Sequence, residues 1–260
     1  MAASLTFSLI QPHMAWEDQS ANLQHYEALI QGNSAPGQIV LLPEMFSTGF
    51  SMQPAPLAET MDGPTVQWMK DMAARHRIIL CGSLIIDADG NFYNRLIWMQ
   101  PDGAHYHYDK RHLFTYAGEH EQYTPGNKKL IVQVNGWRIC PLICYDLRFP
   151  VFSRNDAAQP YDVLLYVANW PEKRRNAWQT LLRARAIENQ CYVAGVNRVG
   201  RDGNGHDYAG DSALISPLGE TIWQAGSGEC VQAWTLDKAL LTDYRAAFPA
   251  LNDADSFRLL

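Results

Sequence analysis

The sequence has no long hydrophobic run, no excess of positive charge and no regular cysteine spacing. None of its apolar runs approaches the ~18 residues needed to span a bilayer. The N-terminal segment lacks the basic region of a secretion signal and leads into Gln11 and Pro12 rather than a cleavage site. With 21 basic and 27 acidic side chains, the net charge is −6 and no basic cluster stands out. We therefore expect neither a membrane nor a nucleic-acid partner.

The cysteines are few and irregularly placed. Cys81, Cys140, Cys144, Cys191 and Cys230 form an odd set without repeated spacing, whereas disulfide-stapled proteins carry even, framework-like sets. Reduced thiols and a cytoplasmic location are expected. At 260 residues and 47% apolar composition, the chain can bury one large core, and no linker or repeat divides it. One domain over residues 1–260 is predicted.

Hydrophobic periodicity predicts alternating strands and helices, typical of an α/β protein. Helices are expected over 16–30, 64–75 and 176–190, and strands over 5–10, 38–42, 138–144 and 162–168. Turns at Asp87–Gly90 and Pro101–Gly103 predict an antiparallel meander in the middle of the sheet. The glycine-rich segment 200–210 lacks the residue order of a phosphate-binding loop, so we expect a flexible surface loop there.

The stretch from Ile139 to Pro150 is the one around which the chemistry is organised. An apolar run reaches Cys144, and turn-forming polar residues follow at once. The thiol is therefore expected at a strand-to-loop elbow that faces a cleft. A buried cysteine is more often an inert small hydrophobe, so the nucleophile hypothesis depends on what other residues accompany it.

Two other strand ends supply the groups that a thiol nucleophile needs. Glu44 follows an apolar strand and is a candidate general base, since an unassisted thiol is mostly protonated at neutral pH. Lys110 lies in a polar turn after a strand over 105–108, where its ammonium could stabilise an oxyanion. Glu119 is placed to hold that ammonium. Taken singly, Glu44 and Lys110 also fit an ordinary capping carboxylate and a solvated lysine.

These three stretches resemble the signature of the nitrilase superfamily of carbon–nitrogen hydrolases, a Glu-Lys-Cys triad in this chain order. The matching blocks are Leu42-Pro43-Glu44-Met45-Phe46, Tyr108-Asp109-Lys110-Arg111-His112-Leu113-Phe114 and Ile143-Cys144-Tyr145-Asp146-Leu147-Arg148-Phe149-Pro150. Further matches at 183–189, at 210–212 and around Pro217 extend the resemblance over nearly the whole chain.

The resemblance implies roles position by position. Glu44 becomes the general base, Cys144 the nucleophile, and Lys110 an oxyanion stabiliser assisted by the backbone N–H of Tyr145. A second glutamate is implied between Lys110 and the Pro-Gly turn; Glu119 is preferred to Glu121 because it lies six residues before Pro125. The resemblance also implies a single-domain four-layer α-β-β-α sandwich, a homodimer, and no metal or organic cofactor.

Within the superfamily, Cys144–Pro150 and Lys110–Phe114 resemble the ω-amidases, which hydrolyse the terminal amide of 2-oxoglutaramate and 2-oxosuccinamate. Such a substrate is a short dicarboxylic acid monoamide, so its pocket must pair the far carboxylate with a cation. Arg148 is the candidate, because a guanidinium binds a carboxylate with two parallel hydrogen bonds. Arg148 could instead hold a neighbouring loop carboxylate. Candidate pocket walls are Phe114, Tyr145 and Trp170.

Three alternatives remain at this point. Other branches of the superfamily, which cleave carbamoyl or other aliphatic amides or nitriles, share the triad. A zinc site could be built from Cys144 with the histidines His105, His107 and His112, although no standard zinc-binding spacing accompanies them. A non-catalytic binding protein on this fold is the third, and the presence of all four catalytic residue types argues against it.

Overall fold

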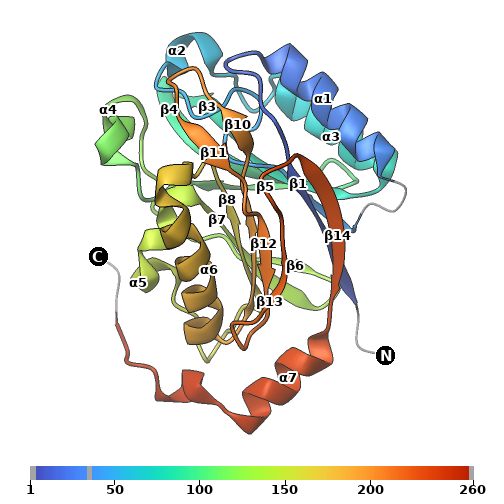
Figure 1. The fold of residues 1–260 in the computed structure, drawn as a ribbon, viewed down its shortest axis with the longest axis vertical. Coiled ribbons are helices and arrows are strands. Elements are labelled where there is room, and N and C mark those ends of the chain that lie inside the picture. Colours follow the sequence, from blue (N-terminus) through green and yellow to red (C-terminus); the bar gives the residue numbers. More distant parts are fainter. Residues whose placement is uncertain (1–3, 34–36, 258–260) are drawn as a thin grey trace.

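Two six-stranded mixed sheets pack face to face, with helices on their outer faces, in the computed structural model (Figure 1). The structure describes residues 4–33 and 37–257. The strand order is β14-β1-β2-β3-β4-β5 in the first sheet and β13-β12-β9-β8-β7-β6 in the second. The arrangement is a four-layer α-β-β-α sandwich, which confirms the predicted fold class. The assignment of one domain to residues 1–260 stays a prediction.

The elements have the following bounds. The first sheet contains β1 (Leu5–Gln11), β2 (Ile39–Leu41), β3 (Ile79–Ala88), β4 (Asn91–Met99), β5 (His105–Asp109) and β14 (Cys230–Leu236). The second contains β6 (Val132–Val134), β7 (Trp137–Ile143), β8 (Val163–Val167), β9 (Tyr192–Val196), β12 (Ala213–Ile215) and β13 (Thr221–Gln224). A separate ribbon pairs β10 (Val199–Arg201) with β11 (Asp207–Ala209).

The helices are α1 (Gln19–Gly32), α2 (Pro54–Leu57), α3 (Pro64–His76), α4 (Glu119–Gln122), α5 (Pro150–Ser153), α6 (Arg175–Asn189) and α7 (Lys238–Ala247). Short 3₁₀ segments cover Thr115–Ala117, Cys144–Arg148, Glu172–Arg174 and Ala250–Asp253. No helix within the described residues is long and apolar enough to cross a membrane.

The first sheet buries both of its faces, and its side chains alternate between them. Phe7 and Leu9 of β1 join the core shared with the second sheet, whereas Ile10 joins the cluster under α1 and α3. In β2, Leu41 likewise joins the core shared with the second sheet, and Val40 joins the cluster under the helices. Because successive strand side chains point to opposite faces, these short apolar strands hold two layers of the molecule together.

The second sheet is covered on its outer face by α6, which contacts β9 and β12 (Figure 1). Trp178, Leu182 and Ala186 recur at helical spacing, are all buried, and join the same core cluster as the sheet residues. These three residues form the apolar stripe by which the helix packs on the sheet. Its packing fixes the turn that leads from β8 into α6, where part of the site described below lies.

The predicted meander exists, but it forms one edge of the first sheet rather than its middle. Strands β3, β4 and β5 pair antiparallel, whereas β1, β2 and β3 pair parallel. Gly90 and Gly103 take φ values of 78° and 84° at the two turns, which glycine adopts without steric cost. The turn residues were enough to predict that these three strands pair antiparallel. Their position in the sheet depends on the parallel strands β1 and β2, which come before them in the chain.

One helix start and one whole helix illustrate where the structure departs from the sequence prediction. Helix α1 begins at Gln19 instead of residue 16, because Glu17 has a φ of 54° and Asp18 caps the helix by accepting from Ala21 N at 2.9 Å. Helix α7 was not predicted. Asp237 begins it by accepting hydrogen bonds from the N–H groups of Ala239 and Leu240.

Candidate active site

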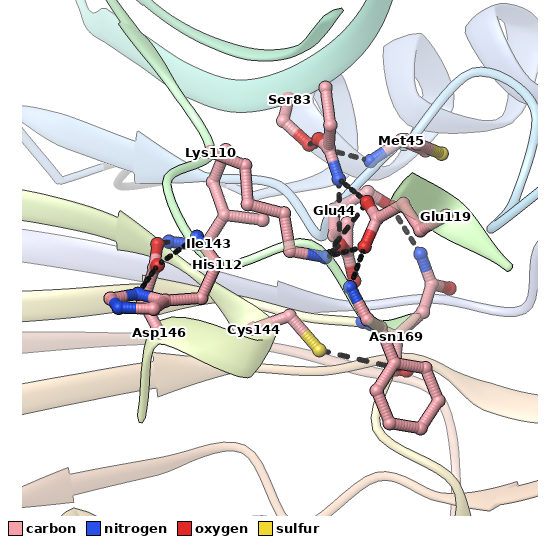
Figure 2. A network of polar contacts seen from close by, with 12 residues as sticks. Glu44, Met45, Ser83, Lys110, His112, Glu119, Ile143, Cys144, Asp146 and Asn169 are labelled. Atoms are coloured by element: carbon pink, nitrogen blue, oxygen red, sulfur yellow. Dashed lines mark hydrogen bonds and ion pairs between the residues drawn. The ribbon is translucent and has the colours of Figure 1, made fainter. Parts of the chain in front are cut away.

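Four functional candidates follow strand ends on the two facing sheets. Lys110 directly follows β5, Glu44 comes shortly after β2, and β2 and β5 run in the same direction. Cys144 directly follows β7, and Asn169 comes just after β8, its parallel neighbour. The carboxyl ends of strands that run together meet at one edge of a sheet, which is where α/β proteins place their sites. Figure 2 shows the four residues converging.

Lys110 lies between two carboxylates. Its Nζ is 2.8 Å from Oε1 of Glu44 and 2.9 Å from Oε2 of Glu119, and all three side chains are buried. Burial by itself would lower the pKa of Lys110, but the Glu119 and Glu44 carboxylates outweigh it and raise that pKa above its ordinary value. Lys110 is therefore a permanent ammonium at physiological pH.

Glu119 occupies the position expected for the second glutamate, and Glu121 does not. Besides the ammonium, Glu119 Oε2 accepts a hydrogen bond from the N–H of Phe114 at 2.5 Å. Burial and then the Glu44 charge raise the pKa of Glu119, while Lys110 opposes them. Glu121 is exposed. The lysine is thus held from both sides, by Glu119 and by Glu44.

Asn94 completes this cluster, and the sequence analysis missed it. Its Nδ2 donates to Glu44 Oε1 at 2.8 Å and to Glu119 Oε1 at 3.1 Å. Its Oδ1 accepts from the Ser83 hydroxyl, which in turn accepts from Met45 N (Figure 2). A polar side chain in the middle of a strand was the available signal, because such a group needs partners once it is buried.

Asn169 is the second residue that the sequence did not single out. Its backbone N–H donates to Glu44 Oε2 at 2.9 Å, and its Nδ2 donates to the Glu44 carbonyl at 2.5 Å. The Cys144 Sγ lies 3.9 Å from the Asn169 carbonyl oxygen. One residue therefore contacts both the carboxylate and the thiol, and the orientation of Glu44 is fixed on every side.

Cys144 stands at a strained elbow with its thiol neutral. Its φ of 38° is uncommon for a residue other than glycine, and such strain clusters at functional sites. Burial, followed by the charge of Glu44, raises the pKa of the Cys144 thiol well above its ordinary value, although Lys110 lowers it. The resting site accordingly holds a thiol beside a carboxylate, a pair in which proton transfer can be coupled to attack.

Asp146 anchors the elbow to the turn that carries Lys110. Its Oδ2 accepts from Ile143 N at 3.0 Å and from the Tyr108 hydroxyl at 2.7 Å. Its Oδ1 accepts from the N–H of His112 at 3.1 Å and lies 2.8 Å from that ring's Nδ1. This buried carboxylate joins the turn after β5 to the turn after β7, and so sets the spacing between ammonium and thiol (Figure 2).

A cavity of about 420 Å³ opens above this cluster. Glu44, Lys110 and Cys144 lie among its lining residues, and the structure also brings to it all four predicted substrate contacts: Phe114, Tyr145, Arg148 and Trp170. The Arg148 guanidinium carbon is 5.0 Å from the centre of the Trp170 ring. Within the described residues Arg148 forms no ion pair, so no loop carboxylate there holds its guanidinium.

The segment predicted as a flexible surface loop is instead one wall of the cavity. Strands β10 and β11 pair antiparallel, and Asp202, Asn204, His206 and Tyr208 line the cavity. The Asp202 carboxylate accepts from two backbone N–H groups of its own turn and from the Tyr208 hydroxyl. These bonds order a glycine-rich stretch that composition alone indicates to be mobile.

The zinc alternative does not fit the geometry. His105 and His107 are exposed on β5, while His112 is engaged with Asp146 and stacks on Phe149 at 3.9 Å between ring centres. Across residues 4–33 and 37–257, no group of three or more His, Cys, Asp or Glu side chains is arranged to hold a metal ion.

The sequence also matches a known protein family over most of its length. Residues 6–246 match the carbon-nitrogen hydrolase family. The chain belongs to that family. As a carbon–nitrogen hydrolase it is 46% identical to ω-amidase YafV of Yersinia enterocolitica, over 99% of this chain and 100% of that protein. It is also 31% identical to the 2-oxoglutaramate amidase of Bacillus subtilis, over 95% and 96% of the two chains.

Solved structures place this hydrolase in the nitrilase superfamily. XC1258 of Xanthomonas campestris, a CN-hydrolase superfamily protein whose structure has an arsenic adduct in its active site, superposes with a TM-score of 0.96 at 48% identity and covers 99% of each chain. Nit3 of Saccharomyces cerevisiae, from branch 10 of the superfamily, gives a TM-score of 0.82 at 26% identity, over 95% of this chain and 94% of that one. Both agree with the four-layer fold.

Proposed function

We propose that this hydrolase is an ω-amidase that converts short dicarboxylic acid monoamides, such as 2-oxoglutaramate and 2-oxosuccinamate, to the acid and ammonia. The observation that carries the proposal is that one cavity holds both a Glu44–Lys110–Cys144 cluster and the Arg148 guanidinium, which forms no ion pair within the described residues. The catalytic cluster suits amide cleavage, and the guanidinium suits an anionic substrate. The names of the two relatives described above support the same substrate class.

In the proposed mechanism Glu44 is the general base and Cys144 the nucleophile. Glu44 takes the proton of the neutral thiol as its sulfur attacks the amide carbon and a C–S bond forms. Negative charge moves to the amide oxygen, which the Lys110 ammonium and the Tyr145 N–H stabilise in a site shielded from water. Glu119 and Asn94 keep ammonium and carboxylate in place.

The second half of the reaction regenerates the thiol. Glu44 passes its proton to the departing nitrogen, the C–N bond breaks, and ammonia leaves a thioester on Cys144. Glu44 then takes a proton from a water molecule that attacks the thioester carbon. The C–S bond breaks, the acid leaves, and the sulfur recovers its proton from Glu44. Every step is a proton or acyl transfer, so the cycle needs no redox partner.

We further propose that the enzyme is cytoplasmic and acts as a homodimer. Free thiols at Cys81, Cys140, Cys144, Cys191 and Cys230 support a reducing compartment. The superfamily resemblance supports the dimer. Sedimentation of the purified protein tests the assembly, since a monomeric mass would contradict it.

The substrate assignment is tested by ammonia release from 2-oxoglutaramate, with glutamine, asparagine and a simple nitrile as comparisons. We expect 2-oxoglutaramate to have the highest kcat/KM, because glutamine and asparagine carry an additional ammonium and the nitrile has no carboxylate. Faster turnover of a neutral amide or a nitrile would contradict the proposal and point to another branch of the superfamily.

A further inference from the structure

The cavity carries more positive charge than catalysis uses. Lys110 is neutralised by Glu44 and Glu119. The cavity is also lined by three cations that lie outside that cluster, namely Arg148, Lys173 and Arg174. The two further acids in the lining hold donors of their own: Glu17 accepts from the Ser51 hydroxyl, and Asp202 from its own turn and from Tyr208. The outer cavity is therefore open to an anion.

Arg174 is held in that outer cavity by aromatic rings. Its guanidinium carbon lies 5.2 Å from the centre of the Phe114 ring and 5.1 Å from that of Tyr116. Its backbone carbonyl accepts a hydrogen bond from the Trp170 indole at 2.9 Å. Because Trp170 carries Arg148 on its ring face, a single indole joins the two arginines.

This assembly continues to the catalytic residues. Phe114 packs edge to face on Tyr145, which follows the nucleophile, with ring centres 4.9 Å apart. The Phe114 N–H donates to Glu119. A ligand that rests against the two guanidiniums is thereby positioned relative to Cys144 through short, rigid contacts.

A stacked guanidinium retains its hydrogen-bonding edge. Contact with a ring uses the flat face of the group and leaves the N–H donors in its plane available for a carboxylate. Within the described part of the chain, neither Arg148 nor Arg174 donates a side-chain hydrogen bond or forms an ion pair. The neighbouring Arg175 is different, because its guanidinium is bound by both oxygens of Asp211 and does not line the cavity.

We propose that Arg174 is a second specificity-determining residue, which binds the carboxylate end of the substrate together with Arg148. The inference rests on the proposed ω-amidase function and deepens it. Two guanidiniums can together reach three acceptor oxygens, so this end of the cavity suits a carboxylate that adjoins a carbonyl. The geometry favours 2-oxo acid amides over monoamides with a lone carboxylate.

The test compares wild type, Arg174→Gln and Lys173→Gln on two amides of the same chain length, 2-oxoglutaramate and uncharged pentanamide. We expect Arg174→Gln to lower kcat/KM for 2-oxoglutaramate by about 10- to 100-fold, the usual effect of losing a hydrogen bond to a charged group. Its turnover of pentanamide should stay within about twofold of wild type, which also reports that the variant is folded. Lys173→Gln removes one positive charge from the adjacent residue. It should leave the preference for 2-oxoglutaramate over pentanamide intact.

The outcomes separate the two proposals. If wild type does not prefer 2-oxoglutaramate to pentanamide, the proposed function fails, and this inference with it. If wild type prefers it and Arg174→Gln keeps that preference, or loses activity equally on both amides, the inference about Arg174 is overturned while the ω-amidase function stands. An equal loss of preference in Lys173→Gln would also overturn it, because the general field of the cavity would then be responsible.

Discussion

Asn94 donates one hydrogen bond to Glu44 and another to Glu119, so a neutral amide bridges the two carboxylates that flank Lys110. Two acids and one ammonium share a buried space. Lys110 donates to Glu44 Oε1 and to both oxygens of Glu119, and Asn94 adds a second donor to each of the two Oε1 atoms. Asn94 supplies two N–H bonds there without adding charge. The cluster thereby keeps one net negative charge for proton transfer.

Replacing Asn94 by Asp should disable the site. The substitution keeps the shape of the side chain but turns the donor edge into a third carboxylate that faces two others. We expect loss of activity and a free energy of unfolding lower by about 2–4 kcal/mol, the cost of an unpaired buried charge. Ammonia release and denaturant unfolding measure the two effects. Asn91→Asp, at the exposed start of the same strand, is the control, and an equal effect there would contradict the account.

Replacing Glu119 by Gln should slow the chemical step while the protein stays folded. Glu119 is the largest of the charges that raise the pKa of Lys110 and also binds its ammonium directly. Without that charge the ammonium is less firmly placed, and we expect kcat to fall by about 10²-fold.

The matched control for this variant is Glu121→Gln, two residues away on the same short helix and exposed. It should have the kcat of wild type. If both variants behaved alike, the assignment of Glu119 as the second glutamate would be wrong.

The sequence predicted the catalytic candidates better than the polar residues that hold them in place. Glu44, Lys110, Glu119 and Cys144 lie in local blocks that carry their own signal, and the structure brings all four together; their catalytic roles stay predictions. Asn94 could not be singled out in the same way, because its importance depends on which two side chains lie opposite it across 25 and 50 residues of chain.

The ribbon of β10 and β11 was misjudged for a related reason. Its glycines and polar residues are typical of a mobile loop, and the bonds that order it depend on tertiary neighbours. Gly203 lies so close to the Trp16 ring that an added Cβ would stand 2.3 Å from it. Such a long-range contact between 16 and 203 leaves no trace in local composition or periodicity.

Stability should fall as the pH rises above neutrality, and the buried thiols contribute to this. Burial raises the pKa of Cys140 to about 12, whereas an unfolded thiol ionises near ~8.5. Between these values the unfolded chain binds fewer protons than the folded one, so the free energy of unfolding decreases with rising pH.

Replacing Cys140 by Ala removes this contribution. The fall in the free energy of unfolding between about pH 8 and 10 should become shallower, by up to ~1.4 kcal/mol per pH unit. Denaturant unfolding at a series of pH values measures the slope. Cys230→Ala, which removes a half-buried thiol, should change it less. A steeper slope in Cys140→Ala would show that the linkage has the opposite sign.

The most direct test of the proposed mechanism is to trap the intermediate. 2-Oxoglutaramate is mixed with wild type and with Cys144→Ala, the reactions are quenched in acid within one turnover, and the digested peptides are weighed by mass spectrometry. We predict that the peptide containing Cys144 gains the mass of the acyl group in wild type, and that Cys144→Ala shows neither this mass nor ammonia release. An acyl group on another residue, or ammonia release that persists in Cys144→Ala, would contradict the mechanism.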